Sequence, residues 1–361
     1  MSYQNVSTPR FYVSILQFLN HFNALNGSFS SNHFFKKNEL ELVSLNPAKQ
    51  GTFNVPSGTG GDFAISYSYL NNSFSDIMPK NKNFKMILGH NFSNVKVFTG
   101  KGSDYANIMI AEEPLVNYVD DSQLRVERNG FSIAKGNDAD DLIDNDSLKF
   151  IIRDYVVGNT YKLGSLLYGT YYDMPVSPNL SLKLSYKYGG IDELTAYNGA
   201  THTNQNWHKP PSWGDGGALE LYDNESQTES WDGTVNLTDK VLSRSGRKSW
   251  DLSFSYISDS DIFGSNQSLS DVIFTDTNYE SEDIAGGDSP YFKYSLLTDD
   301  NFFSQVWHKT LGGALPFVFQ PDNLNKNPDQ FAICKFVDNS LKIDQTAFNV
   351  YDISLKIEEV W

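Results

Sequence analysis

The sequence predicts an all-β protein built from short strands. Aromatic residues make up 14% of the 361 residues, with 25 Phe and 20 Tyr, and aromatic side chains favour strands. They stand in a background of Asn, Ser, Asp and Gly, residues that favour tight turns. Several segments also alternate strictly between apolar and polar residues, a pattern typical of half-buried antiparallel strands.

Three segments show this alternation most clearly. Each places apolar side chains on one face of a strand and polar or charged side chains on the other, so each is expected to cover a core with its apolar face. The strands are expected at residues 180–188, 250–256 and 351–357. Their apolar faces are Leu180, Leu182, Leu184, Tyr186 and Tyr188, then Trp250, Leu252, Phe254 and Tyr256, then Tyr351, Ile353, Leu355 and Ile357.

One helix is expected near the C-terminal end, at residues 300–313. Asp299 or Asp300 is expected to cap its start, and Gly312 or Gly313 to end it. The residues that would share one face of this helix are Phe303, Val306, Trp307 and Thr310.

Residues 11–22 follow Pro9 and also place apolar residues near helical spacing. They predict a short amphipathic helix or an aromatic-rich arm, buried within the chain or against a neighbouring subunit. The apolar positions are Phe11, Ile15, Phe18, Leu19 and Phe22.

The length of the chain predicts two domains, with a boundary where Gly and Pro punctuate residues 165–178. The first domain, residues 1–170, is expected to be a β-sandwich that carries the aromatic N-terminal arm. The second, residues 171–361, follows the order strand, helix, strand, strand, strand. Long polar loops are expected within it at residues 198–247 and 258–298.

Charge and hydropathy exclude some partners. The formal charge of -16 argues against nucleic acid, because binding of phosphates needs clustered Lys and Arg. The N-terminus lacks the pattern of a signal peptide, and no apolar run approaches the roughly 18 residues that cross a bilayer. Cys334 is the single cysteine, which excludes an intrachain disulfide, and its apolar surroundings predict a small buried hydrophobe.

No residue pattern points to catalysis, a cofactor or a metal. His202 and His208 lie close together but lack the further ligands of a zinc site. The acidic segment with Asp138, Asp140, Asp141, Asp144 and Asp146 does not match a calcium loop, so a solvated turn is expected. Motifs for a nucleophile or a phosphate loop are absent. Paired carboxylates for glycoside cleavage are spatial and leave no sequence motif.

Three tryptophans in the first polar loop are the candidate contact residues: Trp207, Trp213 and Trp231. Their rings could stack on sugar rings or fill an interface between subunits. The sequence leaves both alternatives open.

The C-terminal segments SRSGRKSWDLSFSYIS, TLGGALPFVFQPD, PDQFAICKF and VYDISLKIEEVW resemble the barrel domain of distal tail and minor tail proteins of tailed bacteriophages. The resemblance covers residues 240–361 and is carried by Arg247, Trp250, Gly312 to Phe317, Phe331 to Lys335, and Trp361. It implies that the C-terminal domain is an antiparallel β-barrel with one short helix.

A second resemblance concerns MILGHNF, residues 86–92, and the segment KLGSLLYGTYYDMPVSPNLSL that begins at Lys162. They resemble the galactose-binding-like jelly roll that precedes such barrels in some phage tail proteins. Arg153 to Gly169 would close this sandwich. The sugar contacts of such jelly rolls cannot be placed on residues of this chain.

The first resemblance implies a structural, non-enzymatic virion protein, made in the cytoplasm of a bacterial host. It would form a closed, usually six-fold ring at the tail tip, joining the tail tube to the hub, baseplate or fibre proteins. Two other functions remain open. One is a carbohydrate-binding adhesin or receptor-binding tail protein that contacts glycan on the host surface, and the other is a glycan-cleaving tail enzyme.

Overall fold

The computed structural model describes residues 7–29, 37–47, 49–54, 63–70, 72, 74–79, 82–90, 95–100, 109–114, 125–128, 131–136, 147–152, 160–180, 183–187, 191–205, 247–263, 297–325 and 330–360. Strands dominate these residues, every strand pair is antiparallel, and the helical segments are short. The prediction of an all-β fold is confirmed.

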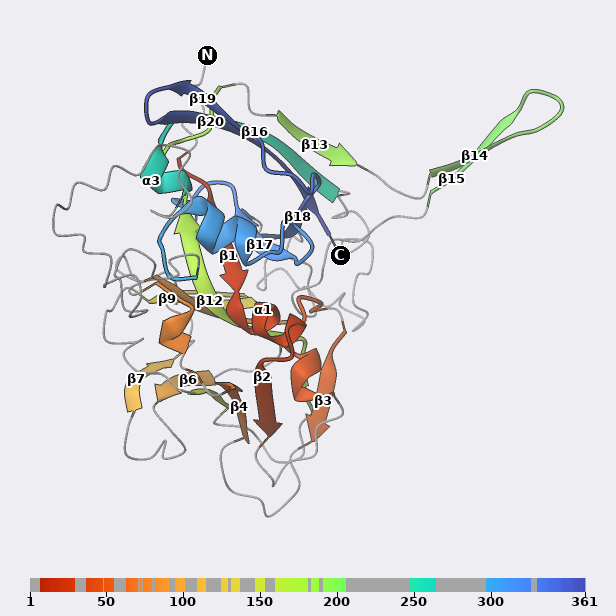
Figure 1. The fold of residues 1–361 in the computed structure, drawn as a ribbon. Coiled ribbons are helices and arrows are strands. Elements are labelled where there is room, and N and C mark those ends of the chain that lie inside the picture. Colours follow the sequence, from red (N-terminus) through yellow and green to blue (C-terminus); the bar gives the residue numbers. More distant parts are fainter. Residues whose placement is uncertain are drawn as a thin grey trace.

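The largest sheet of the described residues has 11 strands and unites both ends of the chain (Figure 1). Strand β1 (Arg10–Ser14) lies near its middle, between β12 (Ser165–Asp173) and β17 (Phe317–Gln320). The strand order is β13-β16-β20-β18-β17-β1-β12-β5-β9-β8, and β19 pairs with β20. The other members are β5 (Asn83–Leu88), β8 (Arg125–Arg128), β9 (Phe131–Gly136), β13 (Lys183–Lys187), β16 (Arg247–Ser258), β18 (Ala332–Phe336), β19 (Ile343–Ala347) and β20 (Val350–Glu359).

A five-stranded sheet lies below the N-terminal half of the large sheet in Figure 1, in the order β2-β4-β10-β6-β7. Two small sheets pair β3 with β11 and β14 with β15. These strands are β2 (Leu25–Phe29), β3 (Gly51–Asn54), β4 (Phe63–Tyr69), β6 (Val95–Gly100), β7 (Met109–Pro114), β10 (Ser147–Ile152), β11 (Thr160–Leu163), β14 (Ile191–Thr195) and β15 (Thr201–Gln205). The helical segments are α1 (Ile15–His21), η1 (Glu39–Glu41), η2 (Phe74–Asp76), α3 (Asp259–Ile262) and the π-helix η5 (Phe303–His308).

The N-terminal strands form the predicted sandwich. Ile65 on β4 and Phe150 on β10 share one buried core with Ile87 on β5 and Tyr168 on β12. This core therefore lies between the five-stranded sheet and one face of the large sheet, and α1 adds Ile15 and other side chains to it. Burial of apolar side chains between two sheets is what stabilises a sandwich.

The expected C-terminal barrel is wrong for the part of the chain that the structure describes. The large sheet is open, with β13 at one end of its strand order and β8 at the other. Its C-terminal strands instead curl over a core of their own, in which Trp250, Phe254 and Tyr351 pack with Phe11 and Phe317. β1 supplies Phe11 to this core and lies between β17 and β12, so it joins the C-terminal strands to the N-terminal strands within one sheet. Because β1 takes the place beside β17, the sheet continues into β12 and β5 and does not close on itself.

The predicted boundary at residue 170 falls within β12. That strand pairs with β1 over its C-terminal half and with β5 over its N-terminal half. One continuous sheet therefore runs through both predicted domains, and the boundary itself stays a prediction.

Residues 11–22 are part strand and part helix. The strand β1 ends at Ser14, and α1 begins at Ile15. The helix prediction is thus right for the second half of the segment and wrong for Phe11, whose ring packs between strands. Pairing with two neighbouring strands overrides the helical spacing there.

Residues 300–313 contain a π-helix, followed by a turn. The side chain that accepts a hydrogen bond in its first turn is that of Asn301, from the Ser304 N–H at 2.8 Å. The expected cap is therefore wrong, and Asp300 instead pairs with Lys82 at 2.5 Å. Gly312 and Gly313 have φ values of 64° and 89° and follow the helix as expected.

Burial along the three alternating strands differs from strand to strand. In β20, Tyr351, Ile353, Leu355 and Ile357 are all buried, as predicted. In β13 every residue is exposed, so the expected half-burial of residues 180–188 is wrong where the structure describes them. β13 lies at the end of the sheet, where its apolar face extends past the core.

Cys334 is confirmed as a buried hydrophobe on β18. Burial raises the pKa of its thiol well above the ordinary value. It packs in the same core as Phe317 and lies opposite that residue in the pairing of β17 with β18.

Substituting Phe317 tests this C-terminal core. Its ring is buried, with centroids 4.8 Å from the Phe336 ring and 5.5 Å from the Phe11 ring. We expect Phe317→Ala to lower the free energy of unfolding by about 3–5 kcal/mol, the usual range for a buried Phe. Urea denaturation of the monomer measures it, with exposed Phe348→Ala as the matched control. An unchanged midpoint for Phe317→Ala would contradict the core assignment.

Candidate functional site

The tryptophans named from the sequence lie outside the described residues. A contact with glycan or with a neighbouring subunit stays a prediction for Trp207, Trp213 and Trp231. His208 and the acidic segment 138–146 also lie outside, whereas His202 is exposed on β15. Among the residues that the structure describes, no group of three or more His, Cys, Asp and Glu could hold a metal ion.

No helix within the described ranges is long and apolar enough to cross a membrane.

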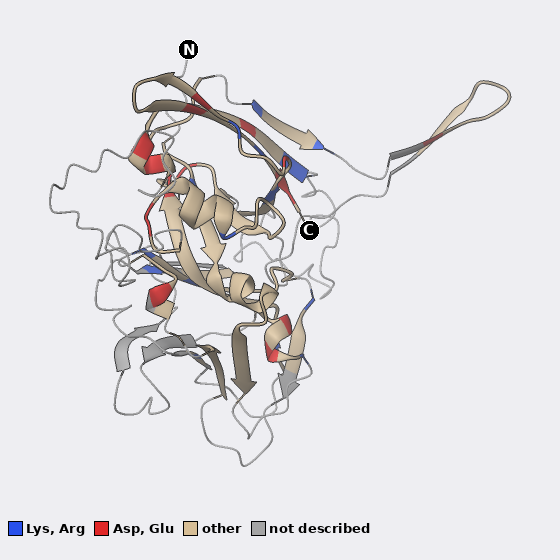
Figure 2. Cartoon of the chain, in the orientation of Figure 1, with Lys and Arg blue, Asp and Glu red and all other residues tan. Residues whose placement is uncertain are grey.

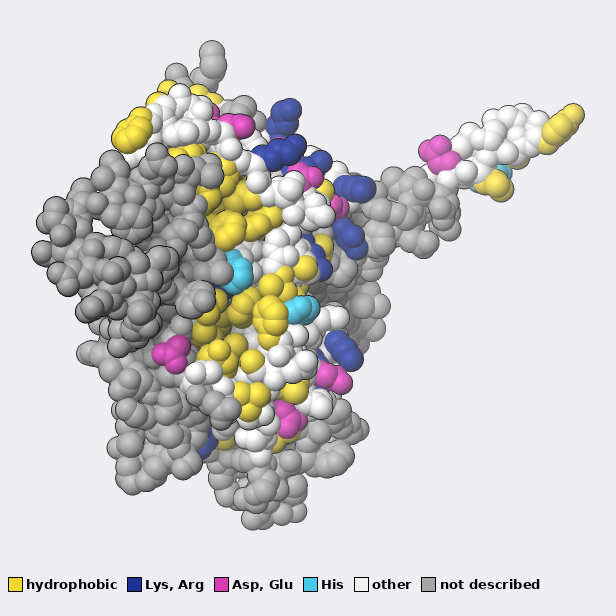
Figure 3. Space-filling view, viewed as in Figure 1, with side chains coloured by type: hydrophobic (Ala, Val, Ile, Leu, Met, Phe, Trp, Pro, Cys, Tyr) yellow, Lys and Arg dark blue, Asp and Glu magenta, His cyan; other side chains and the backbone are white. Residues whose placement is uncertain are grey.

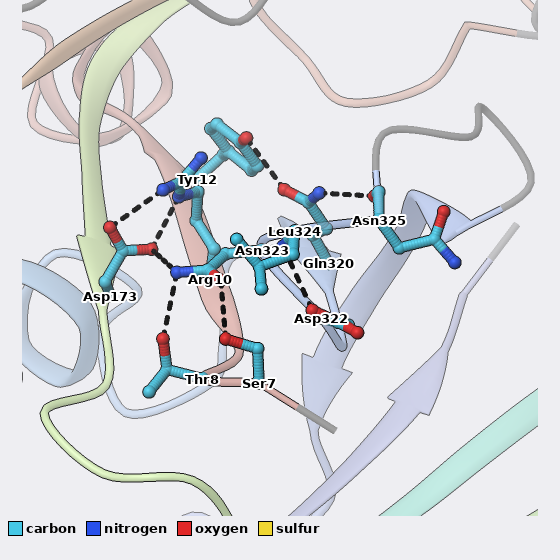
Figure 4. Close-up of polar contacts among 10 residues, drawn as sticks. All are labelled: Ser7, Thr8, Arg10, Tyr12, Asp173, Gln320, Asp322, Asn323, Leu324 and Asn325. Atoms are coloured by element: carbon cyan, nitrogen blue, oxygen red, sulfur yellow. Dashed lines mark hydrogen bonds and ion pairs between the residues drawn. The ribbon is translucent and has the colours of Figure 1, made fainter. Parts of the chain in front are cut away.

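A buried polar cluster joins β1 to β12 (Figure 4). The Arg10 guanidinium donates two hydrogen bonds to the Asp173 carboxylate, at 2.5 Å from Nε and 2.8 Å from Nη2. Its Cζ lies 4.9 Å from the centre of the Tyr171 ring. The Arg10 side chain is 8% exposed and that of Asp173 is 29% exposed. A two-pronged pair of this kind, stacked on a ring, fixes the arginine in one geometry.

The same cluster holds the residues that precede β1. Asn323, in the turn after β17, donates from Nδ2 to Thr8 Oγ1 at 2.9 Å and to Asp173 Oδ1 at 3.3 Å. It also accepts a hydrogen bond from Ser7 Oγ at 3.0 Å, and its backbone N–H donates to the Thr8 carbonyl at 3.1 Å. Figure 4 shows these side chains converging from three segments that are distant in sequence. The cluster therefore fastens the N-terminal segment to the C-terminal half of the chain.

The electrostatics agree with a structural role for this cluster. Burial alone would lower the pKa of Arg10, but its hydrogen bonds to Asp173 and attraction by its neighbours raise it above the ordinary value. Burial raises the pKa of the Tyr12 hydroxyl, which donates to Gln320 Oε1 at 2.9 Å. It also raises the pKa of Tyr171 to about 12. These groups thus keep their protonation state across the neutral range and do not serve as acids or bases there.

A second buried polar cluster lies where η5 packs on β12. Lys309 Nζ donates to Gln305 Oε1 at 2.6 Å, and Thr170 Oγ1 donates to the same oxygen at 3.1 Å. All three side chains are buried. Asn83 lies opposite Thr170 in the pairing of β5 with β12 and is also buried. A buried lysine is costly for the folded state when it carries its charge.

Lys309 predicts a pH dependence of stability. Burial lowers its pKa to about 7 in the folded chain, although Asp300 acts in the opposite direction. Between about pH 7 and pH 10 the unfolded chain binds this proton and the folded chain does not, so stability rises with pH across that window. As the pH is raised through this window, we expect the free energy of unfolding of the wild type to increase more than that of Lys309→Met. Urea titrations at several pH values measure the difference, and equal slopes for the two proteins would contradict the prediction.

His90 follows β5 in the turn that resembles the jelly-roll motif. It is buried, and its Nε2 lies 2.7 Å from Ser132 Oγ on β9. Gly89 before it has a φ of 67°, and a Cβ there would approach the Pro47 carbonyl oxygen to 2.5 Å. Burial lowers the pKa of His90 to about 4, so the ring is neutral at pH 7 and supports packing.

Exposed apolar residues in the second half of the chain define a candidate surface for contact with another protein chain. β14 and β15 form a two-stranded hairpin, Ile191–Gln205, which projects away from the body of the molecule (Figure 1). We call it the projecting hairpin. Leu194 is 70% exposed on it, and Tyr197 at its turn is fully exposed. Figure 3 shows hydrophobic side chains at its outer end.

β13, the strand that precedes the hairpin in the sequence, also has exposed apolar side chains. β13 pairs with β16 on one side, and the other side is the end of the sheet among the described strands. Leu184 and Tyr186 on this strand are 47% and 52% exposed. An open sheet edge with exposed apolar side chains is a template for pairing with another chain.

No family model matches this sequence, and no curated protein matches it either. Three solved carbohydrate-binding modules are similar, over nearly their whole length, to part of the structure. The first is the family 32 module from C. perfringens NanJ in complex with galactose, with 13% identity, a TM-score of 0.28, and coverage of 43% of this chain and 98% of that chain. The second is CBM32-3 from a family 31 glycoside hydrolase from Clostridium perfringens, with 12% identity, a TM-score of 0.29, and coverage of 41% of this chain and 92% of that chain. The third is CBM32-1 from a family 31 glycoside hydrolase from Clostridium perfringens, with 9% identity, a TM-score of 0.25, and coverage of 40% of this chain and 94% of that chain.

Proposed function

We propose that this chain is a structural subunit that assembles with further copies of itself into a closed ring. On the strength of the sequence resemblance, the ring belongs to the tail tip of a tailed bacteriophage and joins the tail tube to the hub, baseplate or fibre proteins. The subunit has no enzymatic role of its own in this proposal. One observation carries the assembly role: the projecting hairpin exposes Leu194 and Tyr197 away from the body.

Isolated two-stranded hairpins are marginally stable in water, because they lack a core. A hairpin that projects with exposed apolar residues fits a protein whose working form includes a neighbour that covers them. The open end of the large sheet at β13 supports the same conclusion.

The oligomeric state of the purified full-length chain tests the proposal. We expect mass photometry to give one closed species of several copies, about six, and electron microscopy to show rings. Purified particles should then contain the same number of copies per tail. A monomer at every concentration would contradict the ring, and release of reducing sugar from polysaccharide would contradict the non-enzymatic role.

Glycan binding is the second candidate function, and Tyr256 favours it. Tyr256 lies on a β-bulge of β16 with a φ of 63°, and its side chain is 83% exposed. Its backbone N–H donates to Asp352 Oδ1 at 3.3 Å. An exposed aromatic ring suits the apolar face of a sugar. Glycan-array binding that Tyr256→Ala removes and Phe348→Ala leaves intact would support this function.

A further inference from the structure

We propose that the projecting hairpin of one copy binds along the edge of β13 in a second copy, on the side where no described strand pairs with it. This inference rests on the proposed self-assembly and names the surfaces that perform it. The occupant of the β13 edge is thus a segment of this same chain, supplied by a neighbour.

The projecting hairpin can supply a strand that pairs with β13 of a second copy. Its two strands pair with one another over five residues, Ile191 opposite Gln205 through Thr195 opposite Thr201. Among the described strands, no third strand pairs with either of them. The outer edges of both strands therefore present backbone groups that a further strand can bind. In its own copy the hairpin points away from β13 (Figure 1).

The β13 edge offers an exposed apolar face to which a strand from a second copy can bind. Leu184 lies opposite Trp250 in the pairing of β13 with β16, so the two side chains share one face of the sheet. Trp250 is buried in the C-terminal core, whereas Leu184 and its neighbour Tyr186 are about half exposed. The apolar face of the sheet therefore extends one strand beyond its core. A strand or hairpin that docks there would cover Leu184 and Tyr186 and would pair with the backbone of β13 on the side away from β16.

The charges of the two elements are complementary. β13 has the sequence KLSYK, with Lys183 and Lys187 at its ends. β14 has the sequence IDELT, with two acidic residues and no basic one, and Glu193 is exposed on it. Figure 2 shows basic residues at both ends of β13 and one acidic segment on the hairpin. In a chain with a net charge of -16, a basic edge strand is an attractive surface for a second copy's acidic hairpin.

The geometry of such a contact agrees with a ring. The hairpin and the β13 edge are different surfaces of the same chain. Each copy can therefore bind one neighbour through its hairpin and a second neighbour through its β13 edge. A head-to-tail contact of this kind closes into a ring when the rotation between copies permits.

Variants of the full-length chain test the contact. Leu194→Ser with Tyr197→Ser should weaken self-association by about 30-fold, the size expected when central apolar contacts are lost. The melting temperature of the monomer should stay unchanged, because both side chains are exposed. Leu324→Ser with Phe348→Ser is the matched control, since these two apolar residues are also largely exposed and lie outside the hairpin and β13. Unchanged assembly of the hairpin variant would overturn the inference.

A charge swap tests the pairing of the two elements. Glu193→Lys should weaken association roughly 5-fold, and copies that carry Lys183→Glu and Lys187→Glu should bind this variant better than they bind the wild type. Failure of the second variant to recover association would count against the pairing.

Cross-linking between two distinguishable copies separates this inference from the ring itself. One tagged copy carries Thr195→Cys, a second carries Ser185→Cys, both positions being exposed, and a short bis-maleimide is added to the mixture. We expect a cross-link between the two tags, and none between copies with only the buried Cys334. Rings that persist without this cross-link, or after replacement of Ile191–Gln205 by a Gly/Ser linker, would overturn the inference and leave the ring intact. A wild type that stays monomeric would overturn both, whereas cross-linked open dimers would support the contact and contradict the ring.

Discussion

Truncation of the chain after Asn349 is expected to give insoluble protein. It removes β20, which pairs with β16 over most of its length and also with β18 and β19. It also takes Tyr351, Ile353, Leu355 and Ile357 out of the C-terminal core. Burial of four such side chains contributes on the order of 1.5–3 kcal/mol each, which together approaches the whole stability of a typical domain. The soluble fraction after expression and the far-UV spectrum of any soluble protein measure the effect.

Replacement of Ile191–Gln205 by a Gly/Ser linker is the control for this truncation. It alters a similar length of chain but no residue of the three cores, so the protein should stay soluble and folded. Soluble, ring-forming protein after the truncation at Asn349 would show that β20 is dispensable for the fold.

The sequence predicted β20 well because it is flanked by strands on both sides. The same alternation in β13 predicted the right strand and the wrong burial. Leu184 and Tyr186 carry the apolar face that the pattern indicates, but no described strand or core residue covers them fully. Alternation determines which side chains share a face. Whether that face is covered depends on the position of the strand in the sheet, which a local pattern does not contain.

The alternation in β16 fails at one residue for a local reason. Trp250, Leu252 and Phe254 are buried as predicted, but Tyr256 is exposed. The pairing with β20 shifts between Phe254 and Ile257, so a β-bulge inserts one extra residue. Ile257 takes the buried place that the period assigned to Tyr256. A positive φ for a tyrosine is a feature that no sequence period indicates.

The buried clusters were beyond sequence reasoning for a different reason. Arg10 and Asp173 are 163 positions apart, and they meet because β1 and β12 are neighbours in the sheet. The position of β1 between β12 and β17 depends on the packing of Phe11 and Tyr12 on opposite faces of the sheet, into two different cores. Asp173 precedes the Met-Pro pair within the segment whose Gly and Pro residues predict a domain boundary, and a local pattern of this kind does not contain its contact with Arg10.

The pair of Arg10 and Asp173 gives the second large effect. We expect Asp173→Ala to lower the free energy of unfolding by about 3–5 kcal/mol, because it leaves a buried guanidinium without its partner. Arg10→Met should be less harmful, since the carboxylate that remains is 29% exposed and keeps access to water. Urea denaturation of the monomer at pH 7 measures both variants.

The double variant Arg10→Met with Asp173→Leu distinguishes the loss of a buried charge from the loss of packing. If the unpaired charge is what destabilises Asp173→Ala, removal of both charges should restore much of the stability, because apolar side chains can fill the same space between β1 and β12. Glu41→Ala serves as the control: it breaks a 3.2 Å pair with Lys49 in which both side chains are largely exposed, and it should change stability by no more than about 1 kcal/mol. Effects of the two single variants that simply add in the double variant would mean that the pair is not coupled, and that β1 is held in the sheet by its pairing and by Phe11 and Tyr12 alone.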